Sequence, residues 1–274
     1  MSGCSDTRVE NCLVRNMGRG GISSSGGSKN HIIGCEVTRT GSKAVSMSGG
    51  DRKSLTRGDC SVVGNHLHHL GRYDWGGGRG FLLGGCGNRA ANNLIHHCPT
   101  GGIAYSGNEH VLELNEVHHV CQLYSDVGVF YTGRDWASRG NVVRWNYIHS
   151  NTNNEGHGSQ AIYLDDCDSG DVVTGNIVFG GVGRGVLLGG GRDNILQGNI
   201  FIACEKPFAL SGNVKEEWLT REGNREWPAN KFAFIPDPAS EDPLDLDRLP
   251  EVWKNVPGFD PIPVEKIGLK GWKK

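Results

Sequence analysis

The most regular feature of the chain is a four-residue segment in which apolar residues alternate with small or polar ones. Its second and fourth residues are apolar in every occurrence except at Ser24. Successive side chains of a β-strand point to opposite faces, so these two positions share one face. The pattern predicts short strands with an apolar inner face and an outer face of mainly small residues, at 21–24, 44–47, 80–83, 102–105, 128–131, 161–164, 185–188 and 207–210.

A second repeat, two apolar residues followed by a spacer and Asn or Cys, precedes each of these segments. Its last position recurs every 22 to 31 residues, at Cys12, Cys35, Asn65, Asn93, Asn115, Asn146, Asn176 and Asn199. The short steps suit a bare coil of a parallel β-helix, whereas a propeller blade needs about 40 residues. Asn at a turn would form an internal ladder, because consecutive coils stack at about 4.8 Å. The sequence therefore predicts an all-β parallel β-helix of about eight coils.

The pattern stops near Val214, and eight of the ten prolines lie at Pro228 or later. We expect a β-helix domain over 1–213 and an irregular C-terminal segment, 214–274, that caps the last coil, because an open stack end exposes unpaired backbone groups. No cap is visible before the first coil. An upstream segment or a second copy of the chain is therefore expected to cover it.

Composition narrows the expected partner. The 274 residues are 36% hydrophobic and 21% charged, with a formal net charge of −2. This balance does not predict the basic surface of a nucleic-acid-binding protein. The sequence contains no run of about 18 apolar residues, so it predicts no membrane-spanning helix. The first residues do not form an export signal, so the localisation is secreted or periplasmic only if a signal lies upstream, and otherwise cytoplasmic. The expected partner is a polysaccharide or oligosaccharide.

The outer face of the sixth strand carries the first candidate site. Asp165 is the one charged residue in its column of equivalent positions, and Asp166 follows it directly. Tyr163 and Phe130 are expected to stand side by side one coil apart, as exposed aromatic residues on which a sugar can stack. Asp165 is predicted to be catalytic, and the other three residues are predicted to bind substrate.

Two long insertions before the fifth and sixth strands carry further candidates, since loops on a regular scaffold often bear function. They contain Asp126, Glu155 and His157, and Arg134 follows the fifth strand. Asp126 is the predicted catalytic partner of Asp165. On a straight sheet the two acids would be about 20 Å apart, so they can act together only if the strand ends curl toward each other.

Histidines recur after the Asn positions, at His68, His69, His96, His97, His118, His119 and His149. Stacked imidazoles can bind a transition metal, but a structural ladder is the favoured interpretation. No acidic cluster has EF-hand spacing, so calcium is expected only as a loop ion. We predict no other cofactor.

Four segments resemble known proteins: 125–135 (SDVGVFYTGRD), 140–149 (GNVVRWNYIH), 160–178 (QAIYLDDCDSGDVVTGNIV) and 256–269. They are similar to right-handed parallel β-helix repeat proteins of carbohydrate metabolism, and most closely to the glycoside hydrolase family of β-helical α-L-fucosidases and xylanases. The resemblance implies two catalytic acids on the β-helix face. By position in the matching motifs these are Asp126 and Asp165, with Asp166 as the second choice.

The leading hypothesis is a glycoside hydrolase that uses this pair of carboxylates, one as proton donor and the other to activate water or attack the anomeric carbon. A polysaccharide lyase or uronate epimerase on the same fold is the alternative, with Arg134, Arg184 and Arg192 as candidate cations. The third reading is a non-catalytic β-helix that binds carbohydrate, because one scaffold hosts many chemistries.

Overall fold

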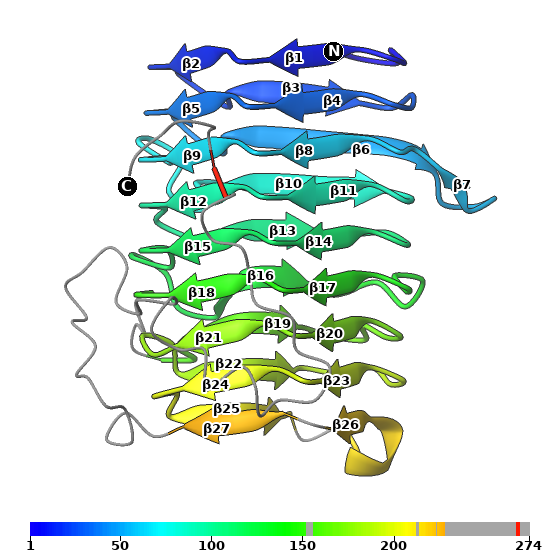
Figure 1. Cartoon of the computed structure of the whole chain (residues 1–274), viewed down its shortest axis with the longest axis vertical. Helices are drawn as coiled ribbons and strands as arrows, with labels where there is room; N and C mark the ends of the chain where they lie inside the picture. Colours follow the sequence, from blue (N-terminus) through cyan, green and yellow to red (C-terminus); the bar gives the residue numbers. More distant parts are fainter. Residues whose placement is uncertain (152–155, 212–213, 223, 228–266, 269–274) are drawn as a thin grey trace.

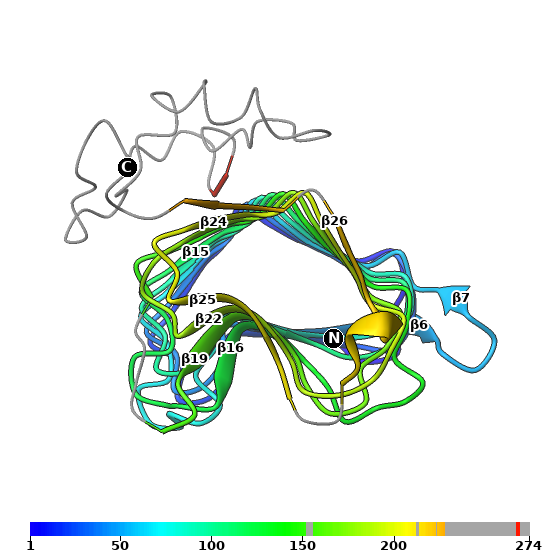
Figure 2. The same cartoon turned by 90° about the horizontal axis from the view of Figure 1, so that it is seen from below.

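The computed structural model describes residues 1–151, 156–211, 214–222, 224–227 and 267–268. The chain winds from top to bottom of Figure 1 as a stack of coils whose strands form three parallel sheets, here called A, B and C. Viewed along the stack, successive coils superpose around one shared interior (Figure 2). The described part of the chain is thus a parallel β-helix.

Each sheet takes one strand from every coil that it crosses. Sheet A contains β3 (Ile22–Ser25), β6 (Val45–Asp51), β10 (Phe81–Gly85), β13 (Ile103–Tyr105), β16 (Val127–Thr132), β19 (Ser159–Leu164), β22 (Arg184–Leu188) and β25 (Lys206–Leu210). Sheet B contains β1 (Arg8–Glu10), β4 (His31–Ile33), β8 (Ser61–Val63), β11 (Arg89–Ala91), β14 (Val111–Glu113), β17 (Val142–Arg144), β20 (Val172–Thr174), β23 (Ile195–Gln197) and β26 (Thr220–Glu222). Sheet C contains β2 (Leu13–Arg15), β5 (Glu36–Thr38), β9 (His66–His68), β12 (Leu94–His96), β15 (Glu116–His118), β18 (Tyr147–His149), β21 (Ile177–Phe179), β24 (Ile200–Ile202) and β27 (Arg225–Trp227).

Two elements depart from this plan. β7 (Thr56–Arg57) pairs antiparallel with β6 and forms a hairpin that projects from the stack (Figure 1). η1 (Glu216–Trp218) is a short 3₁₀ helix between β25 and β26. Among the residues that the structure describes, no helix is long and apolar enough to cross a membrane.

The apolar positions of sheet A form one continuous column inside the stack. The residues in register, one per coil, are Ile22, Val45, Phe81, Ile103, Phe130, Ile162, Val186 and Phe208. They pack with the inward side chains of sheets B and C in a single core cluster. The predicted inner face is therefore present, and burial of such side chains stabilises the fold by about 1.5–3 kcal/mol each.

The register of the fifth coil differs from the prediction by one residue. Phe130, not Val129, pairs with Ile162, so Phe130 points inward and is fully buried. Tyr131 consequently faces outward and lies opposite Tyr163. The expectation that Phe130 binds substrate on the outer face is wrong, because a one-residue slip moves every side chain of a strand to the other face.

The small residues at the first position of each predicted strand do not form a smooth outer floor. A Cβ on Gly80 would lie 2.7 Å from Cγ2 of Ile95, and one on Gly102 would lie 2.5 Å from Cγ1 of Val117. Both contacts are with inward side chains of sheet C. Gly80 and Gly102 are glycines because they occupy the inner corner between sheets C and A, where no room remains for a side chain.

The predicted Asn ladder is present at the turn between sheets B and C. Each Asn side chain accepts a hydrogen bond on Oδ1 from the backbone N–H of the equivalent residue one coil earlier, over 2.8–3.1 Å, at Asn65, Asn93, Asn115, Asn146, Asn176, Asn199 and Asn224. Because the ladder satisfies buried donors in every coil, it fixes the register of the stack.

A second ladder, between sheets A and B, was not predicted. The residue directly before each sheet B strand accepts a bond from the coil before it, at Asn88, His110, Asn141, Asp171 and Asn194. The sequence signal is an Asn one or two residues before the apolar pair of the repeat. We missed it because His110 and Asp171 interrupt it.

Coil regularity extends past the predicted domain boundary at residue 213. β26 pairs with β23 and β27 with β24, so the segment expected to cap the stack begins by adding strands to it. The N–H of Gly268 donates to the carbonyl of Asn92 over 2.7 Å. This contact lies on the fourth coil rather than on the last one (Figure 1). Most of the predicted cap, 228–266, lies outside the described residues.

Candidate active site

Two tyrosines and two aspartates come together on the outer face of sheet A. Tyr131 of β16 and Tyr163 of β19 pair across the sheet, with ring centroids 5.5 Å apart and edge-to-face geometry. The Tyr131 hydroxyl donates to Oδ2 of Asp165 over 2.9 Å, and the Tyr163 hydroxyl donates to Oδ1 of Asp126 over 3.3 Å. Each aspartate therefore has a tyrosine hydroxyl as a hydrogen-bond partner.

The tyrosine pair connects the two predicted catalytic acids. Tyr131 donates to Asp165 and Tyr163 donates to Asp126, and, after burial, the charge of Asp165 also raises the pKa of Tyr163. The two acids thus accept hydrogen bonds from tyrosines whose ring centroids are 5.5 Å apart, although the acids lie about 20 Å apart on a straight sheet.

The electrostatics of the site follow from this crowding of oxygen atoms. Burial and the bond to Asp165 raise the pKa of Tyr131 to about 12. Burial, together with the negative charges of Asp165 and Asp126, also raises the pKa of Tyr163. Both hydroxyls therefore keep their protons at neutral pH and act as hydrogen-bond donors. Tyr131, which is charged only in the high pH range where arginine itself titrates, and the carboxylates of Asp165 and Asp166 raise the pKa of the exposed Arg134 guanidinium.

Asp165 is held between two glycines. It lies in register with Gly133 in the coil before and Gly189 in the coil after. A Cβ on Gly189 would lie 2.6 Å from Oδ1 of Asp165, and one on Gly133 would lie 2.7 Å from its Cβ. Oδ1 also accepts a bond from the N–H of Asp166 over 2.9 Å. Asp165 is 7% exposed and its carboxylate is fixed on both oxygens.

A pocket of about 560 Å³ adjoins Asp165 on the side toward sheet B. Its size is that of typical small-molecule sites. The lining residues are Arg134, Trp136, Asp166, Cys167, Gly189, Gly190, Gly191, Arg192 and Trp218. Trp136 is 71% exposed, and the guanidinium of Arg192 stands 5.7 Å from the Trp218 ring. The pocket offers aromatic faces, two cations and a carboxylate to a ligand.

The model of a family described as "Right handed beta helix region" matches residues 1–201. The chain belongs to this right-handed β-helix family. The predicted right-handed parallel β-helix is confirmed, whereas a specific relationship to fucosidases and xylanases is not shown. No protein of curated function matches the chain.

Among solved structures, this β-helix is similar to an alginate lyase from Paenibacillus sp. str. FPU-7. The identity is 13%, the match covers 81% of this chain and 76% of that chain, and the TM-score is 0.41. A likeness this weak carries no argument about the reaction. The chemistry of this β-helix protein has to be argued from its own residues.

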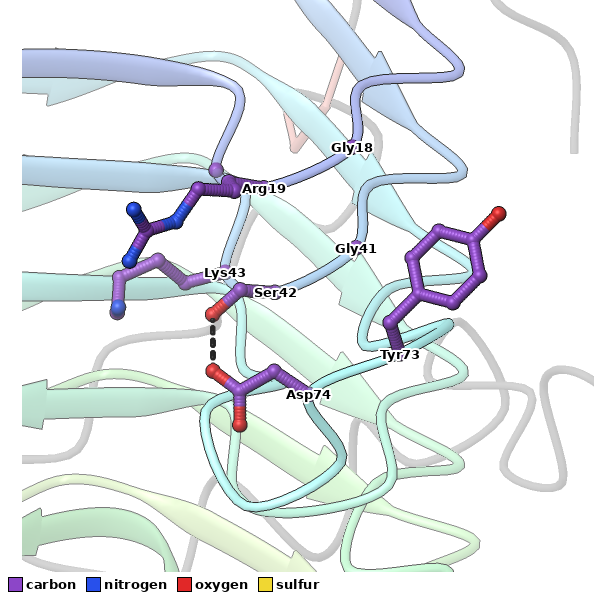
Figure 3. Close-up of a pocket in the computed structure, with 8 residues that line it drawn as sticks. Gly18, Arg19, Gly41, Ser42, Lys43, Tyr73 and Asp74 are labelled. Carbon is purple, nitrogen blue, oxygen red and sulfur yellow. Dashed lines mark hydrogen bonds between the residues drawn. The ribbon is translucent and has the colours of Figure 1, made fainter.

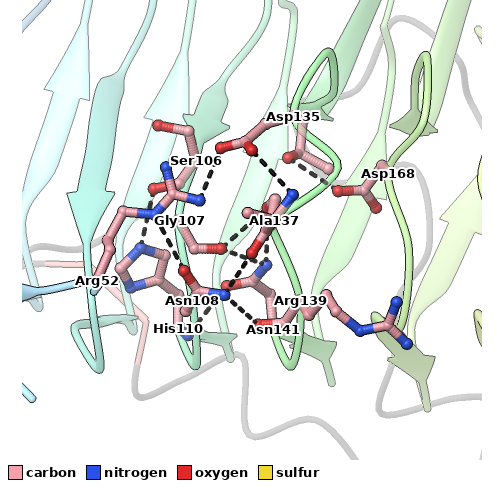
Figure 4. Close-up of polar contacts among 12 residues, drawn as sticks. Arg52, Ser106, Gly107, Asn108, His110, Asp135, Ala137, Arg139, Asn141 and Asp168 are labelled. Carbon is pink, nitrogen blue, oxygen red and sulfur yellow. Dashed lines mark hydrogen bonds and ion pairs between the residues drawn. The ribbon is translucent and has the colours of Figure 1, made fainter. Parts of the chain in front are cut away.

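The loop of the β-helix that carries Arg134 and Trp136 is anchored by a polar network (Figure 4). Arg52, from the hairpin of β6 and β7, pairs with Asp135 over 2.7 Å and donates to Oδ1 of Asn108 over 3.0 Å. Asn108 in turn donates to the carbonyl of Ala137 over 2.7 Å. The network joins residues of the second, fourth and fifth coils and holds the outer wall of the pocket in place.

The other predicted site residues lie close to this centre. Asp166 is exposed and pairs with Arg134, whose Nε lies 3.3 Å from Oδ2 of the carboxylate. His157 has an exposed side chain and precedes Gly158, whose carbonyl accepts the N–H of Asp126 over 2.7 Å. Arg134, Asp166 and His157 therefore flank the two acids, whereas Glu155 lies outside the described residues.

Sequence reasoning missed Tyr131, Trp136 and Trp218. Tyr131 was assigned to the inner face through the register slip. Trp136 follows the motif GRD in the insertion after β16. An exposed Trp in a loop next to a candidate acid is a usable signal for a sugar-stacking residue.

A second pocket, of about 340 Å³, lies on the first three coils of the β-helix. Figure 3 shows Arg19 and Lys43 from consecutive coils side by side, with Ser42 donating to Oδ2 of Asp74 over 2.8 Å. None of the predicted site residues lines this pocket.

Two buried carboxyl groups lie beneath the site. Asp168 and Asp171 are fully buried, and burial raises the pKa of both. The Tyr105 hydroxyl donates to Oδ2 of Asp171 over 3.2 Å, and the Thr132 hydroxyl donates to Oδ1 of Asp168 over 3.4 Å. Because burial and then the charge of Asp171 raise the pKa of Asp168 to about 8, the pair retains a proton at neutral pH.

Proposed function

We propose that this protein is a carbohydrate-active enzyme, specifically a glycoside hydrolase that acts on a polysaccharide with Asp126 and Asp165 as its two carboxylates. The observation that carries the proposal is that each acid accepts a hydrogen bond from one of two tyrosines whose rings contact each other, with centroids 5.5 Å apart. Glycoside hydrolysis needs two carboxyl groups about 5–9.5 Å apart across the scissile bond. The contacting tyrosines hold the two acids on the same part of the sheet surface, which supports a joint reaction.

The surroundings of the two acids support different roles. Asp165 accepts bonds on both oxygens, which suits a carboxylate that attacks the anomeric carbon or activates water. Oδ1 of Asp126 accepts a hydrogen bond from the Tyr163 hydroxyl. We assign to its Oδ2 the transfer of a proton to the leaving oxygen of the sugar. Tyr131 and Tyr163 act as fixed donors that orient the pair.

The pocket beside Asp165 is the proposed binding site for sugar residues next to the cleaved bond. Trp136 and Trp218 offer flat apolar faces, which match the C–H faces of a pyranose ring. Arg134 and Arg192 can donate to hydroxyl or carboxyl oxygens of the sugar.

A polysaccharide lyase is the second candidate, and Arg134 is the observation that favours it. Its guanidinium lies beside Tyr131, Asp165 and Asp166, where it could neutralise the carboxylate of a uronic acid. A carboxylate would then remove the C5 proton. We rank this reaction second because both tyrosines hold their protons and Arg134 is already paired with Asp166.

The deciding experiment follows reducing-sugar release and the ultraviolet absorbance of unsaturated uronates in parallel. The substrates are xylans, fucosylated glycans, pectins and alginates, and the proteins are wild type, Asp126→Asn and Asp165→Asn. A hydrolase releases sugar without new absorbance, and each substitution lowers the rate by about 10²–10⁴-fold. New absorbance would assign a lyase, and ligand binding without turnover in wild type would assign a binding protein.

Asp166→Asn is the matched control. It makes the same chemical change one residue away, on a carboxylate whose side chain is 54% exposed and faces Arg134. A kcat within a few-fold of wild type is expected, with the loss confined to KM because Asp166 lines the pocket but does not react. If Asp166→Asn abolished turnover while Asp165→Asn did not, the assignment of the two neighbouring acids would be reversed.

A further inference from the structure

Eight of the eleven histidines gather along one edge of the stack, where sheet C ends. They are His66, His68, His69, His96, His97, His118, His119 and His149. The rings of one column, from His68 through His96 and His118 to His149, stack with centroids 4.8–5.0 Å apart. A second, outer column consists of His69, His97 and His119, whose successive ring centroids are 4.6 and 5.1 Å apart.

Three consecutive coils repeat the same pair of neighbouring imidazoles. The two Nδ1 atoms are 2.7 Å apart in His68 and His69, 2.6 Å apart in His96 and His97, and 2.7 Å apart in the third pair, His118 and His119. The second residue of each pair is left-handed, with φ of 48–53°, which turns its ring toward that of the first. Three coils thus present identical two-nitrogen clusters.

The backbone does not require histidine at the left-handed position. Arg39 occupies it one coil earlier, with φ of 53°, and Ser150 occupies it one coil later, with φ of 47°. Both follow the last residue of a sheet C strand, as His69 does. The turn therefore forms without an imidazole, and the paired rings are an additional feature of the three middle coils.

The spacing of the nitrogen atoms is close to that of a metal chelate. A hydrogen bond from an N–H donor is usually about 2.9–3.0 Å long, so 2.6–2.7 Å is short for one. Two nitrogens on one zinc ion, each at about 2.0–2.1 Å, lie about 2.9–3.4 Å apart. Opening a pair by a few tenths of an ångström would admit an ion. One ligand atom from each of His69, His96 and His97 lies within 4.8 Å of the others.

We propose that His69, His96 and His97 bind a divalent transition-metal ion, with a fourth position open to water. Imidazole nitrogen is a preferred ligand of Zn²⁺, Ni²⁺, Cu²⁺ and Co²⁺. The three residues form a path from solvent inward, because His69 is exposed, His97 is half-buried and His96 is buried. The site lies at the turn between sheets C and A, apart from the proposed carboxylate pair.

Metal uptake by the full chain, made without a histidine tag and stripped with a chelator, tests the proposal. Zn²⁺ and Ni²⁺ are titrated by calorimetry, and retained metal is measured after dialysis. The variants are His69→Asn and His97→Asn, because Asn also tolerates left-handed backbone. Each is expected to weaken binding by at least about tenfold. Arg39→Asn makes the same change at the equivalent position one coil away and is expected to bind as wild type does.

The proposal would be overturned if wild type took up neither ion, or if His97→Asn bound metal as tightly as wild type. The histidines would then form only a hydrogen-bonded structural ladder. Circular dichroism confirms that each variant is folded. Should a variant not fold, X-ray absorption at the zinc edge of the wild-type protein decides. It should show nitrogen ligands at about 2.0–2.1 Å with imidazole scattering, and a shell without imidazole would refute the assignment.

Discussion

Asp171→Asn is expected to make the protein more stable at neutral and alkaline pH. Asp171 occupies a position of the second ladder that is Asn in the coils on either side, Asn141 and Asn194. Asn141 donates to its Oδ1 from both N and Nδ2, over 3.0 and 2.9 Å. An amide keeps these acceptor contacts, because its oxygen takes the place of Oδ1. It also offers two N–H donors toward Asp168.

The magnitude follows from the raised pKa. Burial raises the pKa of Asp171 to about 7, whereas an unfolded chain has a value near 3.9. From about pH 4 to about pH 7 the folded state therefore retains a proton that the unfolded state has lost, so stability falls as the pH rises. At about 1.4 kcal/mol per unit the upper limit is about 4 kcal/mol. Because Asp168 shares the proton and remains buried, we expect about 1–3 kcal/mol at pH 8 and little change at pH 4.

Urea denaturation followed by circular dichroism at pH 4 and pH 8 measures this difference directly. Asn141→Asp is the matched control, because it adds a carboxyl group to the same ladder and should steepen the loss of stability with pH. The reasoning is refuted if Asp171→Asn is less stable than wild type at pH 8, or if its effect is the same at both pH values.

Three further changes test the ladder, the site and its loop. Asn115→Ala leaves the buried donors of the preceding coil unpaired and should cost about 2–4 kcal/mol in urea denaturation; a loss under 0.5 kcal/mol would mean that water replaces the ladder. Gly189→Ala places a methyl group 2.6 Å from the present position of Oδ1 of Asp165 and should lower turnover by about 10²-fold in a folded protein; full activity would place the reacting carboxylate elsewhere. Arg52→Met removes the anchor of the loop that carries Trp136 and should raise KM more than it lowers kcat; an effect on kcat alone would contradict a role in substrate binding.

The architecture could be predicted from the sequence because every coil of a β-helix repeats the same pattern of apolar and polar residues. The alternation within each strand fixes the inner face, and the Asn at each turn marks where one strand ends. Position 171 shows the limit of this reasoning. An Asp among Asn residues breaks the apparent repeat, although its Oδ1 accepts the same backbone hydrogen bond as the amide oxygen does.

The register slip of the fifth coil has a different origin. In the segment GVFYT (128–132) both Val129 and Phe130 are apolar, so two frames satisfy an apolar inner face equally well. Pairing with Ile162 selects the frame, and that pairing depends on the lengths of the insertions on either side. Local periodicity cannot supply this information. Tyr131, the most informative residue of the site, was therefore not predicted, because its side chain faces outward only in the observed frame.

The convergence of Asp126 and Asp165 is also a tertiary property. Counting residues along straight strands separates the two acids by about 20 Å, and nothing in the period of the repeat says how far the sheet bends. Tyr163 closes the gap, because its long side chain carries a hydroxyl across the sheet surface to the far strand end. Tyr163, which the sequence suggested as a sugar-stacking residue, therefore also donates a hydrogen bond to a carboxylate. In the proposed hydrolase Tyr163 orients Asp126, Tyr131 orients Asp165, and we expect the sugar to stack on Trp136 and Trp218 in the adjoining pocket.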